Sequence, residues 1–419
     1  MLRQLLPVSA LFLGSAFLLF GGGINGLILP VRGTSEGFSS LSLGMLGTGW
    51  ALGYVSGCVL TAGLVSRVGH IRAFGAMAAV AAITILASAL LITPWAWIVL
   101  RGICGFCFAG TAMIVESWLS DRTDPEARGR IFGIYTMVNL GATTAGQMML
   151  TLGDPNGFAF FALAAIFYCL ALVPTAVTSS STPPPLASVK LNMRALWRNS
   201  SVSVFSVFWV GVSNAAFGTL AAVYAERIGL VLAAIAFFTS LPILAGAVMQ
   251  VPVGYMSDRM DRRKVLIGIA VLALLADAGF LVLAPESRDL NLLLASVLGG
   301  SIYAMYPVIV AHANDHAEPG TSLQISGGLL MTYGIGSIVG PLLAGWAMED
   351  LGLRALFGMT ALSHIMIVLF TMYRITRREA PSEAEKTVFQ PATAGRTSTL
   401  QTMPLRNGDP APGTAEQPA

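Results

Sequence analysis

The sequence contains twelve predominantly apolar stretches, each of about 20 residues or more, the length a helix needs to cross a bilayer. They run near residues 6–30, 42–65, 73–93, 95–119, 131–152, 157–177, 202–226, 231–255, 265–284, 291–311, 323–347 and 354–374. Only 11% of the 419 residues are charged, whereas a soluble domain carries about a quarter. Backbone groups in lipid must be satisfied within their own segment. We therefore expect an all-α integral membrane protein with twelve transmembrane helices.

Basic residues predict how these helices are oriented. When the loops are assigned alternately to the two sides, one side holds Arg3, Arg67, Arg72, Arg122, Arg128, Arg130, Lys190, Arg194, Arg198, Arg259, Arg262, Arg263, Lys264 and the basic residues between Arg374 and Arg406. The other side holds only Arg32, Arg227, Arg288 and Arg354. By the positive-inside rule the first side is cytoplasmic, so both termini are expected in the cytoplasm. The first stretch is long enough to be an uncleaved helix rather than a signal peptide.

A short basic turn occurs twice, which indicates an internal duplication. It reads Ser66-Arg67-Val68-Gly69-His70-Ile71-Arg72 and then Ser257-Asp258-Arg259-Met260-Asp261-Arg262-Arg263-Lys264. Asp258 follows Ser66 by 192 residues, and Glu318 follows Glu126 by the same interval. We therefore expect two pseudo-symmetric six-helix halves, residues 1–177 and 202–374. A Ser- and Pro-rich cytoplasmic linker, 178–201, would join them, and residues 375–419 would form a disordered cytoplasmic tail.

This arrangement resembles the Major Facilitator Superfamily (MFS), whose members carry a G-x-x-x-D-R/K-x-G-R-K/R-K/R motif between helices 2 and 3 and between helices 8 and 9. Gly254, Asp258, Arg259, Arg262 and Arg263 match the second copy, with Asp261 at the second glycine position. The first copy is degenerate, because Ala62, Ser66 and His70 replace Gly, Asp and Arg. The Glu116-Ser117-Trp118-Leu119 helix end and the Arg128-Gly129-Arg130 loop are similar to the YcaD-type bacterial subgroup, which implies a bacterial inner membrane.

The two turns are expected to form a cytoplasmic gate, because their charges can pair with helix ends in one conformation and separate in another. The predicted gate residues are Ser66, Arg67, Arg72, Glu116, Asp258, Arg259 and Arg262. Glu116 is expected within reach of Arg67 or Arg130. Since Ser66 carries no charge, the N-terminal latch should be the weaker one. The alternative is that both turns serve only as topology signals.

Two charged residues lie inside predicted membrane helices. Arg101 is about 9 Å along helix 4, and burying an arginine near mid-bilayer costs roughly 2.5–3.5 kcal/mol, so it should face a polar cavity or a partner. The resemblance associates an arginine here with proton coupling or an anionic substrate; the alternative is snorkelling to the surface. Asp277, near the middle of helix 9, could load and release a proton. Helix 9 is peripheral in the family, which favours an interhelical hydrogen bond instead.

Uncharged polar residues complete the predicted substrate site. In the family, helices 1, 4, 7 and 10 line the cavity, which implies Asn25, Arg101, Asn214, Tyr303 and Tyr306, and Asn139, Gln147 and Gln250 could contribute. Each is alternatively a helix-packing hydrogen bond. His312, Asn314, Asp315 and His316 could hold a metal, but a solvated helix end is the preferred interpretation. Cys104 and Cys107 form a C-x-x-C spacing that we interpret as small buried residues.

These features predict a secondary active transporter of a small solute that works by alternating access, with protons as the coupling ion. An organic anion or amphipathic metabolite is favoured slightly by Arg101. No G-x-x-x-x-G-K-[ST] loop is present, so neither nucleotide nor any other cofactor or metal is expected. The chain should act as a monomer in lipid, without enzymatic activity and without binding nucleic acid. The alternative is a transport-inactive sensor or scaffold with the same fold.

Overall fold

The computed structural model describes residues 9–123, 128–177, 192–283, 285–317, 321–377 and 389. This part of the chain is helical and contains no strand. The helices of the first half are α2 (Ser9–Ser35), α3 (Ser40–Val68), α4 (His70–Leu90), α5 (Pro94–Asp121), α6 (Arg128–Met149), η2 (Leu150–Leu152), α7 (Ala159–Leu170) and α8 (Leu172–Val177). A short helix, α9 (Met193–Asn199), precedes the second half, which comprises α10 (Ser201–Arg227), α11 (Leu232–Arg259), α12 (Arg262–Ala278), η3 (Gly279–Leu283), α13 (Arg288–Asp315), α14 (Ser322–Asp350) and α15 (Ala355–Ile375).

Each of the twelve predicted spans is a helix. Among the described residues, 11 helical segments are long and apolar enough to cross a membrane. The remaining predicted span, 131–152, corresponds to α6 and η2. It is less apolar because Asn139, Thr143, Thr144 and Gln147 interrupt it. The all-α membrane fold expected from the sequence is thus confirmed.

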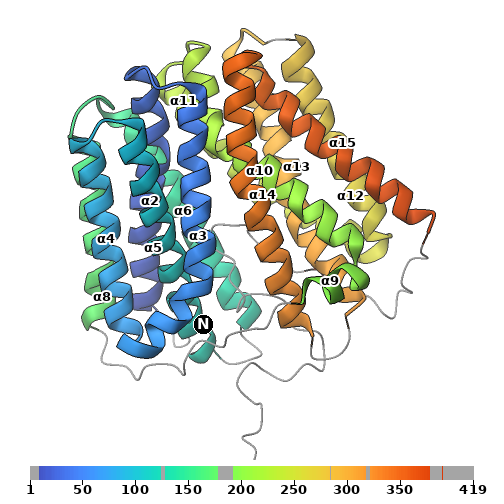
Figure 1. Cartoon of the computed structure of the whole chain (residues 1–419), viewed down its shortest axis with the longest axis horizontal. Coiled ribbons are helices and arrows are strands. Elements are labelled where there is room, and N and C mark those ends of the chain that lie inside the picture. Colours follow the sequence, from blue (N-terminus) through green and yellow to red (C-terminus); the bar gives the residue numbers. More distant parts are fainter. Residues whose placement is uncertain are drawn as a thin grey trace, which may run out of the picture.

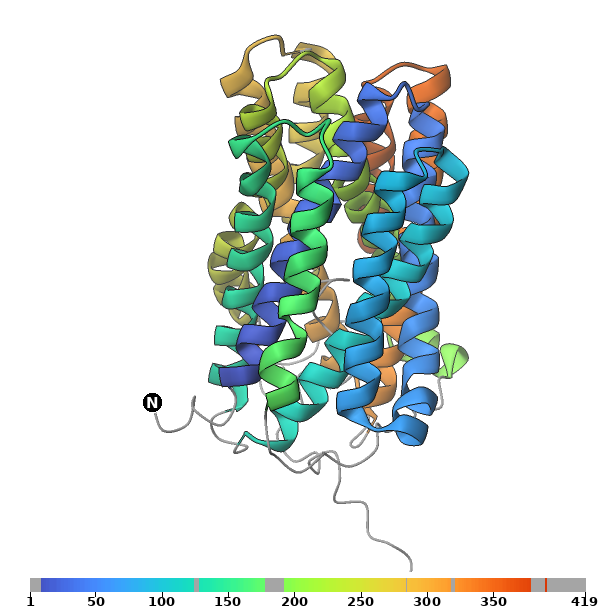
Figure 2. The ribbon, with the colours of Figure 1, turned by 90° about the vertical axis from the view of Figure 1, so that its left-hand side faces the viewer.

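The two halves repeat the same helix packing. Within the first half α3 packs on α5, α2 on α6 and α7, and α4 on α5 and α7. Within the second half the equivalent pairs recur: α11 with α13, α10 with α14 and α15, and α12 with α13 and α15. The halves stand next to each other in Figure 1, and Figure 2 shows the helices of the first half running side by side. This repetition confirms the two pseudo-symmetric six-helix halves.

Contacts between the halves are uneven. α3 packs extensively on α14, whereas the equivalent pair, α11 with α6, meets over a shorter stretch, and α10 also contacts α2 and α3. Gly44 permits the first contact, because a Cβ there would lie 2.3 Å from the carbonyl oxygen of Pro341. Gly345 approaches the backbone of Ser40 in the same way.

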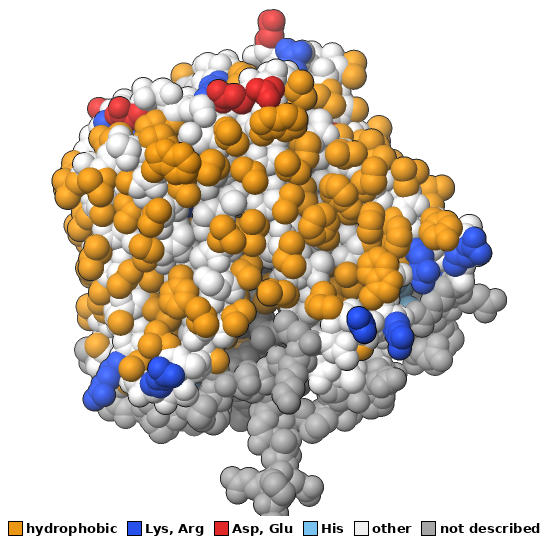
Figure 3. Space-filling model, in the orientation of Figure 1, with side chains coloured by type: hydrophobic (Ala, Val, Ile, Leu, Met, Phe, Trp, Pro, Cys, Tyr) orange, Lys and Arg blue, Asp and Glu red, His pale blue; other side chains and the backbone are white. Residues whose placement is uncertain are grey.

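The molecule has two polar ends separated by an apolar belt. On the face shown in Figure 3, hydrophobic side chains cover the middle, Lys and Arg lie at one end, and Asp and Glu lie at the other end together with a few Lys or Arg side chains. We call the first the basic end (Arg67, Arg72, Arg259 and Lys264) and the second the closed end (Ser40, Arg227 and Glu349). The N-terminus of α2 and the C-terminus of α15 both lie at the basic end. The predicted linker, apart from 192–201, and the predicted tail beyond Arg377, apart from Phe389, lie outside the described residues.

Candidate functional site

A cavity of about 390 Å³ lies between the two halves. Helices α2, α3, α5, α6 and α7 line it from one half, and α10, α11, α13 and α14 from the other. Of the six residues predicted for substrate or coupling, Asn25, Arg101, Asn214 and Tyr303 line this cavity. Tyr306 and Asp277 do not.

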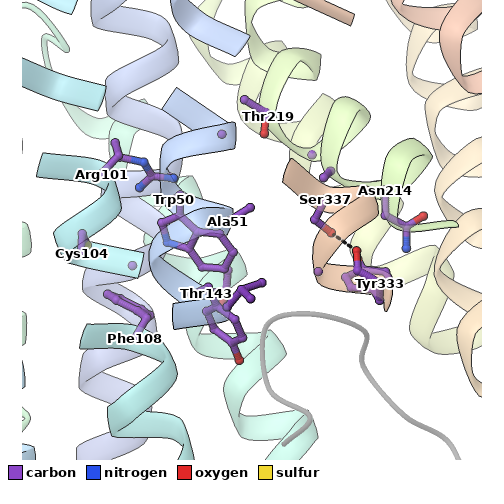
Figure 4. Close-up of a pocket in the computed structure, with 18 of the residues that line it drawn as sticks. Trp50, Ala51, Arg101, Cys104, Phe108, Thr143, Asn214, Thr219, Tyr333 and Ser337 are labelled. Atoms are coloured by element: carbon purple, nitrogen blue, oxygen red, sulfur yellow. Dashed lines mark hydrogen bonds between the residues drawn. The ribbon is translucent and has the colours of Figure 1, made fainter. Parts of the chain in front are cut away.

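Arg101 is the only charged side chain among the lining residues in the described part of the chain. It is half-buried on α5, beside two glycines that bring α5 against α3. A Cβ on Gly53 of α3 would lie 1.8 Å from the carbonyl oxygen of Gly102, and a Cβ on Gly105 would lie 2.2 Å from that of Trp50. The Arg101-Gly102-x-x-Gly105 segment therefore combines a close helix contact with a cationic group in the cavity wall. Figure 4 shows Arg101 on the same side of the cavity as Cys104 and Phe108.

An aromatic wall adjoins Arg101, and the sequence analysis did not identify it. Trp50 and Tyr54 stack on α3 with ring centroids 4.9 Å apart, and Phe108 meets Tyr168 edge to face at 5.7 Å. Tyr333 lies across the cavity on α14. The i,i+4 spacing of Trp50 and Tyr54 was the available signal, since it places both rings on one face of a helix. The wall can hold the apolar body of a solute.

Several buried polar atoms at the cavity have no hydrogen-bond partner among the described residues. Asn25 Nδ2 donates to the Tyr168 hydroxyl at 3.1 Å, but Asn25 Oδ1 accepts no hydrogen bond from the described residues. Neither side-chain polar atom of Asn214 is bonded, nor is the Tyr54 hydroxyl. Buried polar groups are normally satisfied, and unpaired ones cost about 1–3 kcal/mol each. These atoms are positioned to receive a polar ligand or water.

The two predicted residues outside the cavity wall are both fully buried. Tyr306 packs edge to face on Tyr333, with ring centroids 5.5 Å apart, and its hydroxyl has no partner among the described residues. Asp277 accepts hydrogen bonds from Thr360 and pairs with His364, both on α15 and both at 2.7 Å. The interhelical interaction considered for Asp277 is therefore present.

Polar contacts join the halves at the closed end. Glu349 Oε2 accepts a hydrogen bond from the backbone N–H of Ser40 at 2.7 Å. Arg227 of α10 donates to the carbonyl oxygen of Phe38 at 2.9 Å and to the Ser40 hydroxyl. Deeper in the bundle, the Ser240 hydroxyl of α11 donates to Gln147 Oε1 of α6 at 2.6 Å. The cavity is thus sealed at this end.

The cavity extends toward the basic end. Its lining residues on α3 continue to Ala62, one turn before Ser66, and those on α14 begin at Gly327, about one turn into that helix. The ribbons of the two halves diverge in the same direction (Figure 1). The structure therefore has a sealed closed end and a cavity directed toward the basic turns.

The second basic turn is held by a buried ion pair. Arg262 lies 2.7 Å from Asp315 of α13, with both side chains 1% exposed, and it also donates to the Ser257 hydroxyl at 2.9 Å. Asp258 is a longer partner at 3.5 Å. Arg259 instead lies over the Tyr255 ring, 3.9 Å from its centroid. Asp315 is the partner that the sequence analysis missed.

Asp261, which replaces the motif glycine, begins the next helix. Its side chain accepts from the backbone N–H of Arg263 at 3.0 Å and caps α12. Burial raises the pKa of the Asp261 carboxyl, but hydrogen bonds and the charge of Arg263 outweigh this and hold the pKa below its usual value. The capping carboxylate is therefore ionised at neutral pH, and its negative charge interacts favourably with the positive end of the helix dipole.

The first basic turn makes fewer contacts. Ser66, Arg67 and Arg72 are exposed, and the Ser66 hydroxyl donates only within its own helix, to the carbonyl oxygen of Gly63. Glu116 is fully buried on α5. Among the ion pairs of the described residues, none joins Glu116 to Arg67 or Arg130. The gating role of these residues stays a prediction.

The end of α13 differs from the expected solvated helix end. His312 and Asp315 are each only 7% exposed and Asn314 is 2% exposed, so that interpretation was wrong. The physical reason is the ion pair with Arg262, a residue far away in the sequence, which draws this end into the protein. Among the described residues no group of three or more His, Cys, Asp or Glu is placed to hold a metal ion.

One residue of the predicted tail contacts the second basic turn. The backbone N–H of Phe389 donates to Asp258 Oδ1 at 2.9 Å, and its ring lies against Gly254. Gly254 is the first position of the motif, and a Cβ there would lie 2.5 Å from the Phe389 ring. Cys104 and Cys107 are buried, unpaired thiols, as expected.

Comparisons with known proteins agree on one family. The model of the Major Facilitator Superfamily matches residues 11–241 and 204–408. An uncharacterized MFS-type transporter of Enterobacter sp. (strain 638) is 24% identical over 381 residues, covering 90% of this chain and 97% of that protein. The uncharacterized MFS-type transporter YcaD of Escherichia fergusonii is 25% identical over 377 residues, covering 88% and 96%.

Solved structures share the fold at low identity. The nucleoside transporter NupG has a TM-score of 0.76 at 13% identity and covers 89% of this chain and 100% of its own. A bacterial homolog of the human lysosomal transporter Spinster, in an inward-facing and occupied conformation, has a TM-score of 0.70 at 15% identity, covering 91% and 97%. These neighbours are membrane transporters whose architecture the chain shares.

Proposed function

Because the chain belongs to the Major Facilitator Superfamily, a family of transporters, and is a multi-pass membrane protein, we propose that it is a secondary active transporter of a small amphipathic organic anion. The observation that carries this proposal is the cavity between the halves, in which Arg101 is the only charged lining residue of the described chain. A cationic side chain in the cavity wall favours an anionic ligand.

The rest of the wall fits an amphipathic solute. Trp50, Tyr54 and Phe108 offer flat apolar surfaces next to Arg101. The unpaired Asn25 Oδ1 and the unpaired side-chain amide of Asn214 come from equivalent helices of the two halves, so one solute can hydrogen bond to both. Ligand sites generally combine an apolar wall with a few placed polar groups in this way.

The uneven contacts between the halves support a mechanism of alternating access. We propose that the basic end is cytoplasmic, because of the positive-inside rule, and that the structure is an inward-facing state. Opening the other side would break the Glu349–Ser40 and Arg227–Phe38 hydrogen bonds and bring the basic turns together. The two halves would then rock around a midplane site, as in other repeat-built transporters.

A proton gradient is the proposed driving force, and a bacterial inner membrane the proposed location. The sequence has no phosphate-binding G-x-x-x-x-G-K-[ST] loop that would indicate nucleotide energy. The relatives named above are bacterial.

The proposal is tested by uptake into proteoliposomes. Purified protein would be offered labelled aromatic and aliphatic carboxylates, with isosteric amides and amines as neutral and cationic comparators, with and without an imposed pH gradient. We expect a carboxylate to accumulate above its level in protein-free liposomes, and the gradient to increase that accumulation. Saturable uptake of amines but of no carboxylate would contradict the anion assignment. Absence of flux across the panel, from folded protein, would favour the sensor or scaffold alternative.

A further inference from the structure

A hydrogen-bonded chain of three side chains crosses the interior of the second half. Asp277 Oδ2 of α12 lies 2.7 Å from His364 Nδ1 of α15, and His364 Nε2 lies 3.0 Å from the Ser213 hydroxyl of α10. Thr360 of α15 donates to the other carboxylate oxygen of Asp277 at 2.7 Å. All four side chains are 0% exposed. These hydrogen-bonded side chains therefore connect α10, α12 and α15 without contact with water.

Among the described residues, His364 is the only charged or titratable group in hydrogen-bond or ion-pair contact with Asp277. α12 packs mainly on α13 and α15 and also meets α11 and η3, and the neighbours of α10 and α15 include α14. On its own helix, Asp277 lies 13 residues after Lys264, about 20 Å along the axis. The remaining charged residues of these helices, and His312, lie near the helix ends: Glu226, Arg227, Asp258, Arg259, Arg262, Arg263, Arg288, Asp289, His312, Asp315, Glu349, Asp350 and Arg374. Of the tyrosines, Tyr303, Tyr306 and Tyr333 lie in the middle of α13 and α14.

The charge of the pair depends on a single proton. With a neutral imidazole, Nδ1–H donates to the Asp277 carboxylate, Nε2 accepts from Ser213, and the net charge is −1. One proton taken from water onto Nε2 forms an imidazolium, the net charge becomes zero, and Ser213 changes from donor to acceptor. A buried, uncompensated charge is far more costly than a neutral buried pair. In this conformation the pair is therefore stabilised by holding the proton.

Helix α10 connects the pair to the transport machinery. Ser213 contacts His364, while the next residue, Asn214, lines the cavity. The same helix ends at Arg227, which bonds to Phe38 and Ser40 of the opposite half at the closed end. α10 also packs on α2 and α3. A change in the His364–Ser213 contact thus acts on an element that reaches both the solute site and the seal.

We propose that Asp277 and His364 form the proton-binding site of this transporter, and that α10 couples its occupancy to the opening of the closed end. The proposal rests on the proposed function. The proton enters from water on one side in a conformation that hydrates the pair and leaves to water on the other side. Ser213 and Thr360 act as positioning residues, since they orient the ring and the carboxylate.

The sign of the coupling follows from burial. Deprotonation leaves one net charge in a volume without water, so it destabilises the conformation described here relative to one in which the pair is hydrated. Raising the pH should therefore lower the population of the state with a sealed closed end. A ligand, here the proton, shifts an equilibrium only through its differential affinity for the two states.

The experiment measures this population without a transported solute. Nitroxide labels at Leu152→Cys and Leu351→Cys, which are 79% and 76% exposed at the closed end of opposite halves, report its opening by pulsed electron paramagnetic resonance. The background carries Cys58→Ala, Cys104→Ala, Cys107→Ala and Cys169→Ser, and the protein is in lipid nanodiscs. From about pH 5 to about pH 9, we expect the open-to-sealed ratio to rise by about tenfold or more.

Two variants and a control make the assignment specific. Asp277→Asn keeps the shape and removes the negative charge, so the imidazole that remains is neutral when buried, and the rise of the ratio with pH should be lost. His364→Asn keeps a donor to Asp277 but leaves only the carboxylate to titrate, so the midpoint pH should move by about one unit or more. Ser203→Ala removes another buried α10 hydrogen bond, to the carbonyl oxygen of Ile309, and should keep the original profile.

The outcomes separate this proposal from the proposed function. A wild-type pH profile in folded Asp277→Asn would overturn the proton site and assign Asp277 a purely structural role, even if uptake is found. If Asp277→Asn does not fold, an unshifted midpoint in His364→Asn has the same meaning. Conversely, a pH-dependent opening that requires Asp277, without flux of any solute in the panel, would leave the proton site standing and overturn transport.

Discussion

The side chains of the cavity wall are positioned by glycines that let neighbouring helix backbones approach each other closely. Arg101 reaches the cavity because Gly102 and Gly105 let α5 lie against α3, which carries Trp50. Arginine is weakly hydrated and offers several donors in a rigid fork that suits carboxylates. The position therefore combines recognition of an anion with the neighbouring aromatic surface.

Replacing Arg101 tests this recognition. For the carboxylate that the wild type transports, Arg101→Ala should lower kcat/KM of uptake about 30-fold or more, because truncating one partner of a buried charged contact costs about 2–5 kcal/mol. Arg101→Lys keeps the charge but not the forked set of donors, so its kcat/KM should lie between the values of the wild type and Arg101→Ala. Arg194→Ala removes an exposed arginine of α9 and serves as the control. Unchanged uptake by folded Arg101→Ala would show that the solute does not depend on this charge.

Sequence reasoning succeeded for residues whose role depends on helix identity and failed where it depends on a distant partner. Asn25, Arg101, Asn214 and Tyr303 line the cavity, as their helices implied. Tyr306, on the same helix as Tyr303, is turned away from the cavity and packs on Tyr333, because helix rotation is set by tertiary packing. The burial of Asp315 and the pairing of Asp277 with His364 depend on partners 53 and 87 residues away, which no local pattern reveals.

At the scale of elements, glycine seams determine which helices approach closely. Gly49, Gly53 and Gly57 place α3 directly on the backbone of α5, and Gly211, Gly336 and Gly340 do the same for α10 and α14. Small residues allow this approach in membranes, where the hydrophobic effect does not drive helix association. The sequence revealed the helices and the small residues, but not which pairs they join, since either neighbour could use the same glycines.

One glycine pair tests the first seam. Gly53→Ala places a Cβ 1.8 Å from the carbonyl oxygen of Gly102, so α3 and α5 must separate. Overpacking should lower the free energy of unfolding by about 1–3 kcal/mol. We expect this loss to outweigh the gain of about 1 kcal/mol in helix propensity. Thermal unfolding in detergent or nanodiscs would measure it. Gly63→Ala on the same helix has nothing within 4 Å and should be neutral or stabilising; equal behaviour of both variants would contradict the seam.

At the scale of the whole molecule, the seal at the closed end opposes the separation of the halves there. α3 and α14 contribute backbone contact, while Glu349 and Arg227 contribute hydrogen bonds to residues 38–41. Individually such bonds are worth about 0.5–1.5 kcal/mol, or more when charged. They are strong enough to bias a conformational equilibrium but weak enough to break in each cycle.

Weakening the seal should shift this equilibrium. In the labelled background, Arg227→Ala should raise the open-to-sealed ratio about threefold or more at constant pH, because two hydrogen bonds across the halves are lost. Arg288→Ala, at the same end, removes an exposed arginine whose ion-pair partner among the described residues is its neighbour Asp289, and it should leave the ratio unchanged. Equal open-to-sealed ratios in the wild type and Arg227→Ala would show that helix packing alone keeps the closed end sealed.

The repetition of helix packing within each half also bears on biosynthesis. Apart from α3 with α14, the extensive pairings of α2 to α7 lie within the first half, so these helices can insert and pack while the second half is still being translated. Chains fold domain by domain from the N-terminus as they emerge. The hydrogen bonds of Arg227 to Phe38 and Ser40 can form only after α10 has been inserted, and that of Glu349 to Ser40 only after α14. We therefore expect the cavity to be the last part of the protein to assemble, once two separately folded bundles meet.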